Sequence, residues 1–176
     1  MKEMFMKKKL FSLLLASVFV LSFSGAVFAV GEEKLPGEDG YGFTYRFASP
    51  STIEITSYYG YEAEVTVPST IDGYTVVGIQ SFHTEEEYSR VNVFVRKVVL
   101  PDTVTYIADS AFYDSDDWSA KAHSELREIV LPEGLKTIGA RAFYNNYYLQ
   151  KIEIPASVTE VGAAAFASCA ELSDVT

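Results

Sequence analysis

The sequence predicts a short solenoid of repeated turns, of the mainly-β or α/β repeat class, with a parallel sheet along its concave side. The first observation is a 23-residue repeat: "LREIVLPEGLKTIGARAFYNNYY" at 126–148 is followed directly by "LQKIEIPASVTEVGAAAFASCAE" at 149–171, which keeps almost every apolar position. The second is period-two alternation of apolar residues, as at Ile129 and Leu131, which is typical of a short strand with one buried face. The third is a proline after each such strand, which ends the hydrogen-bonded ladder.

The first 29 residues have the pattern of a secretory signal peptide. A basic cluster at 7–9 precedes an apolar run at 10–23, and small residues stand at the −3 and −1 positions of a cleavage site after Ala29. We expect residues 30–40 to be a flexible linker. We expect the mature chain to be secreted or displayed on the cell surface, with no membrane segment left after cleavage. The alternative is an uncleaved anchor, because apolar character continues weakly to Val30.

The charge of the mature chain excludes some partner classes. Four of the 14 lysines and arginines and one of the 24 acidic residues lie before residue 30, so 10 basic and 23 acidic residues remain, a net charge of −13. Such a chain repels phosphate backbones, so nucleic acid is not an expected partner. Its one cysteine forms no internal disulfide, and stability must come from packing or from a partner.

The segment before the repeats is rich in aromatic residues. Tyr41, Phe43, Tyr45 and Phe47 alternate, which puts their rings on one face of a strand. We expect that face to pack against the first repeat.

Residues 65–176 carry the repeats, of which the last is incomplete. In each unit an alternating strand is followed by a proline and then by a segment such as Ile-Gly-x-x-Ala-Phe, which returns across the core. One unit cannot cover its own apolar face, so neighbouring units must stack. The expected core residues are Val98, Leu100, Ile107, Phe112, Leu126, Ile129, Leu131, Ile138, Phe143, Leu149, Ile152, Ile154, Val161, Phe166 and Cys169.

The pattern LxxIxLPxxLxxIGxxAFxxC at a period of 23 resembles the BspA-type leucine-rich repeat of secreted and surface-exposed bacterial proteins. The resemblance covers about residues 41–176, because the segment at 41–76 is similar to the amino-terminal hairpin that covers the first repeat in this family. It implies a β-hairpin cap over residues 41–64 and a buried Asn or Cys where Asn146 and Cys169 stand. It also implies surface display and adhesion to host, matrix or bacterial proteins.

Two early units are longer than the regular one, and both insertions follow the recurring phenylalanine that we expect to be buried, at 83–94 and 113–125. They hold both histidines, the only tryptophan and two acidic clusters. We interpret them as a two-loop recognition site with an aromatic anchor in a polar rim. The alternative is a pair of solvated loops with the tryptophan folded back over the solenoid. The candidate ligand-binding residues are His83, Glu85, Glu86, Glu87, Asp114, Asp116, Asp117, Trp118 and His123.

No metal, cofactor or catalytic set is expected. The aspartates at 114–117 offer oxygen ligands that calcium prefers, but they lack the glycine and the terminal glutamate of an EF-hand loop. Cys169 lies in the last unit, whereas both histidines belong to earlier insertions, which disfavours a Cys-His pair. A Ser-His-Asp set within 113–125 lacks rigid support. The sequence contains no HExxH motif and no glycine-rich phosphate loop.

The outward residues of the predicted sheet, such as Lys97, Val99, Glu128 and Val130, are mixed in charge and free of aromatic rings, which does not favour sugar binding. We therefore expect a non-catalytic binding module whose partner is a protein. The alternatives are a structural or assembly spacer and a fragment of a larger surface protein. Residues 172–175 begin a further strand, so self-association through this edge is also considered.

Overall fold

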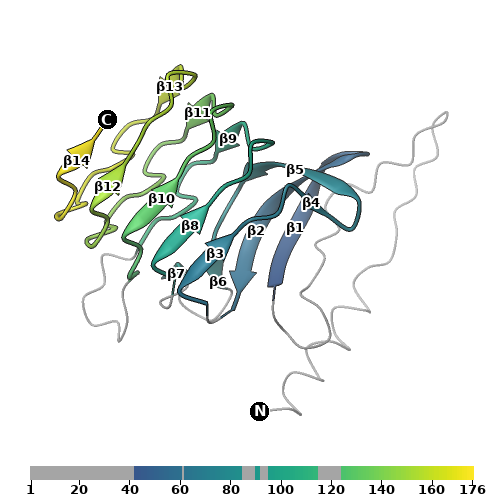
Figure 1. The fold of residues 1–176 in the computed structure, drawn as a ribbon, viewed down its shortest axis with the longest axis horizontal. Coiled ribbons are helices and arrows are strands. Elements are labelled where there is room, and N and C mark those ends of the chain that lie inside the picture. The colour runs from purple at the N-terminus through teal and green to yellow at the C-terminus, as the bar shows by residue number, and fades with distance from the viewer. Residues whose placement is uncertain (1–41, 61, 85–89, 92–94, 115–123) are drawn as a thin grey trace, which may run out of the picture. The chain divides into compact units, whose positions relative to one another are not determined.

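The computed structural model describes residues 42–60, 62–84, 90–91, 95–114 and 124–176. Within these residues the chain forms β-strands, turns and bends, with no α-helix, so the mainly-β form of the prediction is correct. Successive turns stack on one another and place two sheets on opposite sides of a shared core (Figure 1). The predicted signal peptide and linker lie outside the described residues.

The predicted parallel sheet is present and has five strands. Each strand lies in the first half of a turn, and the order of the strands across the sheet is β14-β12-β10-β8-β3. The pairing is in register from turn to turn, so that Val65, Val98, Ile129, Ile152 and Val175 form one inward row. The strands are β3 (Glu64–Thr66), β8 (Lys97–Val99), β10 (Glu128–Val130), β12 (Lys151–Ile152) and β14 (Asp174–Val175).

The second half of each turn adds a strand to another sheet, with the order β1-β2-β5-β9-β11-β13 and with β4 paired to β5. Three of its parallel strands are two residues long, too short to show an alternating pattern in the sequence. They are held in register by parallel pairing between turns, as between Ile107 and Ile138. The repeat strands are β4 (Thr70–Ile71), β5 (Tyr74–Ile79), β9 (Tyr106–Ile107), β11 (Thr137–Ile138) and β13 (Glu160–Val161).

The expected hairpin cap consists of β1 (Gly42–Ser49) and β2 (Thr52–Tyr59), which pair antiparallel. Strand β2 then runs parallel to β5, so the hairpin extends the second sheet at the start of the solenoid. The predicted aromatic face packs inward: Tyr45 is buried, and the ring of Phe43 lies 4.9 Å from that of Tyr58 and 6.3 Å from that of Phe82. The cap therefore covers the first turn with aromatic side chains.

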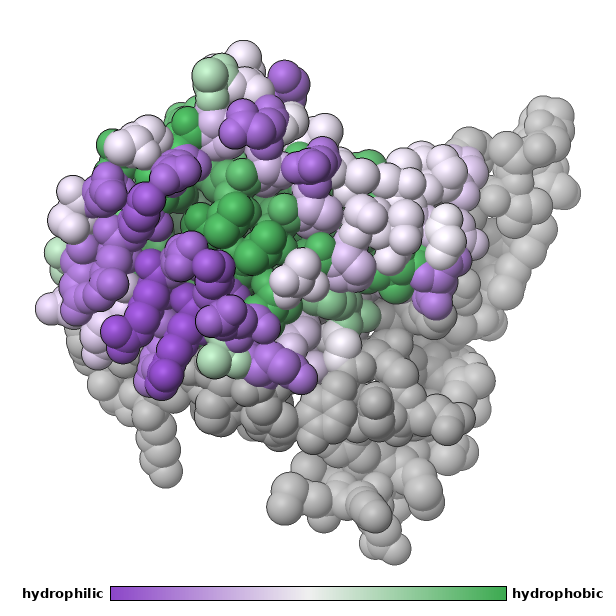
Figure 2. All heavy atoms as spheres, viewed as in Figure 1, coloured by the Kyte–Doolittle hydropathy of each residue, from purple (hydrophilic) through white to green (hydrophobic). Residues whose placement is uncertain are grey.

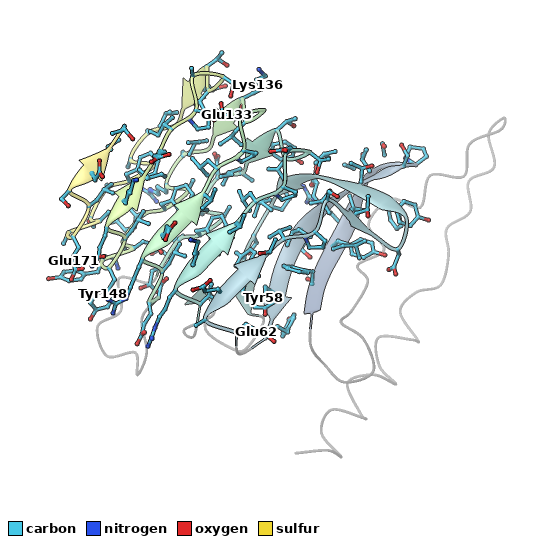
Figure 3. The ribbon with its side chains drawn as sticks, in the orientation of Figure 1. Tyr58, Glu62, Glu133, Lys136, Tyr148 and Glu171 are labelled. Atoms are coloured by element: carbon cyan, nitrogen blue, oxygen red, sulfur yellow. The ribbon has the colours of Figure 1, made fainter. Side chains whose placement is uncertain are left out.

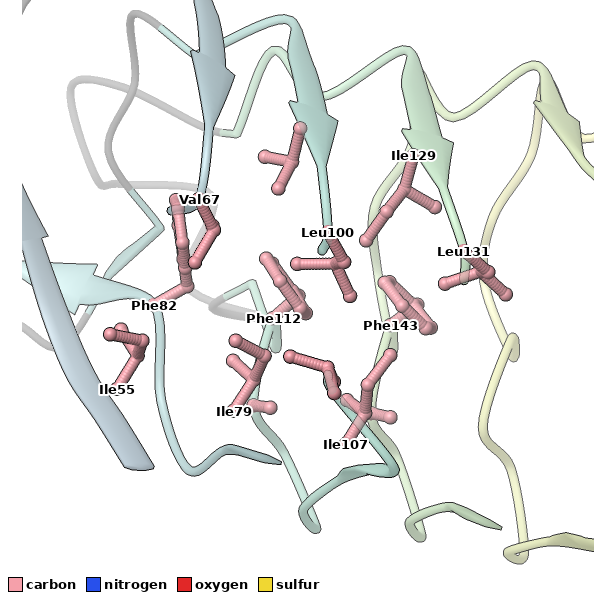
Figure 4. Packing of buried hydrophobic residues seen from close by; sticks show 14 of the residues in the cluster. Ile55, Val67, Ile79, Phe82, Leu100, Ile107, Phe112, Ile129, Leu131 and Phe143 are labelled. Atoms are coloured by element: carbon pink, nitrogen blue, oxygen red, sulfur yellow. The ribbon is translucent and has the colours of Figure 1, made fainter. Parts of the chain in front are cut away.

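One phenylalanine from each turn forms a continuous stack through the core. The ring centroids of Phe82, Phe112, Phe143 and Phe166 are separated by 5.0, 5.1 and 5.3 Å. The first two rings are tilted by 28°, and the later pairs are nearly parallel, at 9° and 4°. Figure 4 shows the first three rings between the residues that follow strands of the five-stranded sheet and isoleucines of the second sheet. The former are Val67, Leu100 and Leu131, and the latter are Ile55, Ile79 and Ile107. Because each ring contacts the next turn, removing one loses packing on both sides, at a cost of about 3–5 kcal/mol for Phe→Ala.

The last turn departs from the expected core. Val161 was predicted to be buried, but 48% of it is exposed. Ile154, Phe166 and Cys169 are only partly buried. The reason is that the equivalent residues of earlier turns are covered on both sides, whereas among the described residues β13 and β14 are the edge strands of their sheets.

A third row of backbone hydrogen bonds joins the turns beside the phenylalanines. The amides of Arg141, Phe143 and Asn145 donate to carbonyls of the next turn at 3.0, 2.8 and 2.9 Å. This row requires left-handed backbone at repeated positions, with φ of 55° at Arg141 and 58° at Ala164. Nearby, Gly139 packs so closely on the backbone of the preceding turn that a Cβ there would collide with Asp109.

Candidate interaction surface

The predicted recognition residues lie mostly outside the described chain. This applies to Glu85, Glu86, Glu87, Asp116, Asp117, Trp118 and His123. The backbone of His83 belongs to β6 (His83–Thr84), which pairs antiparallel with β7 (Arg90–Val91) and lies against β2 of the cap. The two-loop site thus stays a prediction.

Asp114 is the exception, and its position corrects the expectation of an exposed acidic cluster. Only 1% of Asp114 is exposed, and its Oδ2 accepts a hydrogen bond from the amide of Ser124 at 3.1 Å. The Ser124 hydroxyl donates to Oδ1 of Asn146 at 3.1 Å, and Nδ2 of Asn146 donates to the carbonyl of Phe112 at 2.6 Å. Asp114 therefore fastens the base of the second insertion to the repeats instead of facing a ligand.

The outer face of the five-stranded sheet carries a row of charges whose sign alternates from strand to strand. Nζ of Lys97 lies 2.9 Å from Oε1 of Glu128, and this contact raises the pKa of Lys97. Nζ of Lys151 lies 2.6 Å from Oε1 of Glu153, which follows the end of the same strand, and this contact raises the pKa of Lys151 and lowers that of Glu153. In order across the sheet the row is Glu64, Lys97, Glu128, Lys151 and Asp174.

The residues just before these strands are also paired between turns. Nε of Arg96 donates to Glu125 at 2.9 Å, and Nε2 of Gln150 donates to Glu171 at 2.9 Å. Between them the Arg127 guanidinium lies 5.8 Å from the ring centre of Tyr148. Figure 3 shows Tyr148 and Glu171 together at this flank. The described cations Arg96, Lys97, Arg127 and Lys151 thus all have partners within the chain.

An apolar pair interrupts this polar face. Val99 and Val130 are direct neighbours in β8 and β10, and 39% of Val130 is exposed. Figure 2 shows hydrophobic residues beside the band of charged ones on this side of the molecule. An apolar centre with a rim of charged groups is the usual anatomy of a protein–protein interface.

A tyrosine cluster that was not predicted from the sequence lies where the chain enters the second insertion. Tyr113 and Tyr144 stack at 5.5 Å, and Arg141 lies 5.9 Å from the ring centre of Tyr144. Tyr147 is 41% exposed and meets Tyr148 edge-on at 5.2 Å. The signal was available in "YNNYY" at 144–148, which occupies the place of the insertions in a regular unit.

The described residues contain no arrangement that points to metal or thiol chemistry. No group of three or more His, Cys, Asp or Glu side chains among them lies close enough together to hold a metal ion. Burial raises the pKa of Cys169 to about 11, and its Sγ donates to the Phe143 carbonyl at 3.1 Å. This thiol is therefore a weak nucleophile at neutral pH. In the same parts of the chain, no helix is long and apolar enough to span a membrane.

Comparison with known proteins agrees with this architecture. The family model for the BspA type leucine rich repeat region matches residues 86–176 in six copies. A leucine rich repeat protein of T. pallidum is 29% identical with a TM-score of 0.53, and the match covers 81% of this chain and 71% of that one. A search of curated proteins gave no match.

Two further solved structures show the same fold at lower identity. The pneumococcal vaccine antigen PcpA is 20% identical with a TM-score of 0.60, and the match covers 84% of this chain and 38% of that one. A leucine-rich repeat protein from Bacteroides capillosus is 21% identical with a TM-score of 0.59, and the match covers 82% of this chain and 97% of that one.

Proposed function

Because this chain belongs to the BspA-type leucine-rich-repeat family, we propose that it is an exported, non-catalytic module that binds a protein on the face of its five-stranded sheet. Repeats of this family build modules of the protein-interaction type. The observation that carries the proposal is the Val99 and Val130 pair, in which Val99 is half-buried and Val130 is exposed beside charges that are already paired. Covering such an apolar pair is favourable at about 25 cal/mol per Å² of surface removed from water.

The charges around the pair support a protein partner over a polyanion. Lys97 and Lys151 each have a carboxylate within 3 Å, and Arg96 has Glu125 at 2.9 Å. A nucleic acid or sulfated glycan has to displace these carboxylates to reach the cations, and the net negative charge opposes its approach. A folded protein with an apolar centre avoids both costs.

The test is site-specific photo-crosslinking on intact bacteria and on immobilised matrix proteins. A photoreactive amino acid at Val130 is expected to give a discrete protein adduct. The same probe at Thr159, an exposed residue next to β13 of the second sheet, is the control. We expect Val130→Glu to weaken capture at least tenfold and to leave the free energy of unfolding within about 0.5 kcal/mol, since Val130 is partly exposed. Protein adducts of equal yield from the probes at Val130 and at Thr159 contradict the proposal.

The two insertions extend this proposal. Trp118, with Asp116, Asp117 and the glutamates at 85–87, is proposed to recognise the same partner from beside the sheet. Capture by a variant with Trp118→Ala and Asp116→Ala tests this contribution separately. Unchanged capture removes the insertions from the proposed site and leaves the sheet face in it.

Export and adhesion are proposed from the amino-terminal pattern and from the family. The basic cluster, apolar run and small residues before Val30 support cleavage after Ala29. Mass spectrometry of the exported protein is expected to show a chain that begins at Val30. An intact amino terminus in the membrane fraction contradicts this part of the proposal.

A role as a spacer or assembly element is the second candidate. In that case partner capture is insensitive to Val130→Glu.

A further inference from the structure

Each of the two ion pairs on the face of the five-stranded sheet exposes its carboxylate more than its ammonium group. In the first pair, 46% of the Glu128 side chain is exposed and 31% of the Lys97 side chain. In the second pair, 70% of the Glu153 side chain is exposed and 50% of the Lys151 side chain. A carboxylate has two oxygens and can accept several hydrogen bonds, so both groups can still bind a donor from outside the chain. On this face the chain therefore offers acceptors more than donors to a partner.

A third carboxylate on the same face takes no part in an ion pair. Glu64 in β3 is exposed, and none of the ion pairs formed by the described residues includes it. Its direct neighbour across the sheet is Lys97, whose Nζ lies 2.9 Å from the carboxylate of Glu128. From β3 to β12 the face thus carries three carboxylates and two ammonium groups, and its excess charge is negative.

These carboxylates surround the apolar pair of Val99 and Val130. The register of β10 and β12, continued by one residue, puts Glu153 beside Val130, about 4.8 Å away between strands. Glu128 precedes Val130 by two residues on the same strand, about 6.6 Å away, and its side chain leaves the sheet on the same face. Glu64 lies on the cap side of Val99, one strand away. A side chain that covers the apolar pair therefore has carboxylates on three sides.

We propose that the partner of this face is a cationic protein surface, in which an aliphatic side chain covers the Val99 and Val130 pair and lysine or arginine side chains around it bind the three carboxylates. The inference rests on the proposed function and adds the chemistry of the partner to it. A neutral or acidic partner removes water from the carboxylates without supplying a donor, which is unfavourable. The net charge of −10 for the whole chain acts in the same direction, because it attracts a cationic partner before contact.

Two peptides of opposite charge test the preference for cations. Each is a cyclic hairpin with an isoleucine and a leucine at the centre of one face, surrounded by lysines in one peptide and by glutamates in the other. The peptides are titrated into the isotope-labelled chain, and NMR follows its amides. We expect the lysine peptide to shift residues 97–99 and 128–130 and to bind about tenfold more tightly than the glutamate peptide, an advantage that shrinks in high salt.

Two matched substitutions separate the site from the net charge of the chain. Glu153→Gln removes a carboxylate beside Val130, whereas Glu160→Gln removes one from β13 of the second sheet; both residues are exposed, and both substitutions change the net charge equally. We expect Glu153→Gln to weaken binding of the lysine peptide about threefold and Glu160→Gln to leave it unchanged. Equal effects of the two substitutions, equal affinities of the two peptides, or shifts centred outside β8 and β10 overturn the proposal.

The photo-crosslinking experiment distinguishes this failure from failure of the proposed function. A discrete protein adduct at Val130, together with peptides that bind equally, keeps the sheet face as a protein-binding surface and overturns only its preference for cations. Absence of an adduct at Val130 overturns the proposed function and the cationic partner with it.

Discussion

The hydroxyl of Tyr106 donates a hydrogen bond to the carboxylate of Glu54, 52 residues earlier in the chain. Tyr106 belongs to β9 of a repeat, whereas Glu54 belongs to β2 of the cap. The ring crosses the intervening strand β5 at Gly78, where a Cβ would collide with it. Nε of Arg46, in β1, donates a hydrogen bond to the other carboxylate oxygen of Glu54 at 2.7 Å. Strands β1 and β2 are therefore tied to β9 through one buried carboxylate.

Tyr106→Phe should destabilise the protein by about 1.5 kcal/mol, the lower end for a hydrogen bond to a charged group, because Arg46 still pairs with the carboxylate. Urea unfolding measures the change. Tyr147→Phe is the control, since Tyr147 is 41% exposed and its change should stay within about 0.5 kcal/mol. Equal effects of the two substitutions would show that the Tyr106 hydroxyl contributes nothing specific.

Stability should decline in alkaline solution. Burial and the bond to Glu54 raise the pKa of Tyr106 to about 12 from the ordinary 10, and burial and carboxylate partners raise the pKa of Tyr45 and Tyr58 further. Because the pKa of Tyr106 is higher in the folded state, its contribution to stability is complete below pH 10 and is lost as the pH rises through 12. The free energy of unfolding between pH 8 and 12 checks this. The free energy of unfolding of the Tyr106→Phe variant should fall less steeply over this range. A slope identical to that of the unmodified protein would contradict the assignment of the loss to the Tyr106 hydroxyl.

Ala164→Gly should stabilise the protein, although glycine usually weakens ordered structure. Ala164 has a φ of 58°, a left-handed conformation that costs an L-residue about 1–2 kcal/mol and glycine almost nothing. After the greater freedom of glycine in the unfolded chain is subtracted, we expect a gain of about 0.5 kcal/mol. Ala163→Gly is the matched control: Ala163 is also exposed but is not left-handed, so a loss of about 0.5–1 kcal/mol is expected. Thermal unfolding of both variants decides the sign.

Cys169 should react slowly with thiol reagents while the protein is folded. Its pKa of about 11 lies at least two units above that of an unfolded cysteine, which reduces the thiolate fraction at pH 8 by about two orders of magnitude. Alkylation by iodoacetamide in buffer and in urea measures the ratio. A folded rate close to the unfolded one would mean that the last turn is open in solution.

The strands of the five-stranded sheet were predictable because each carries enough residues to show which side faces the core. Ile129 and Leu131 point inward around Val130, and proline follows. The phenylalanine position was equally clear, since Phe112 and Phe143 recur at the same place in their units and both are fully buried. The strand alternation and the recurring phenylalanine can be read from short stretches of sequence. The stacking of the turns then determines how these residues pack.

The second sheet, the buried Asp114 and the tie between cap and repeat were not predictable in the same way. A strand such as Thr137–Ile138 has no alternation to read. Left-handed residues at Arg141 and Ala164 give no glycine signal, because the turn-to-turn hydrogen bonds impose the conformation. Asp114 looked like part of an acidic surface because its partners, Ser124 and the backbone of the next turn, are near it only in the folded chain.

The alternating row from Glu64 to Asp174 also limits how such an array can lengthen during evolution. Genes for repeat proteins grow by copying units. Copying one turn sets two carboxylates or two ammonium groups side by side in the row, whereas copying two adjacent turns preserves the alternation. On this face the charge pattern therefore repeats after two turns, although the fold itself repeats after one.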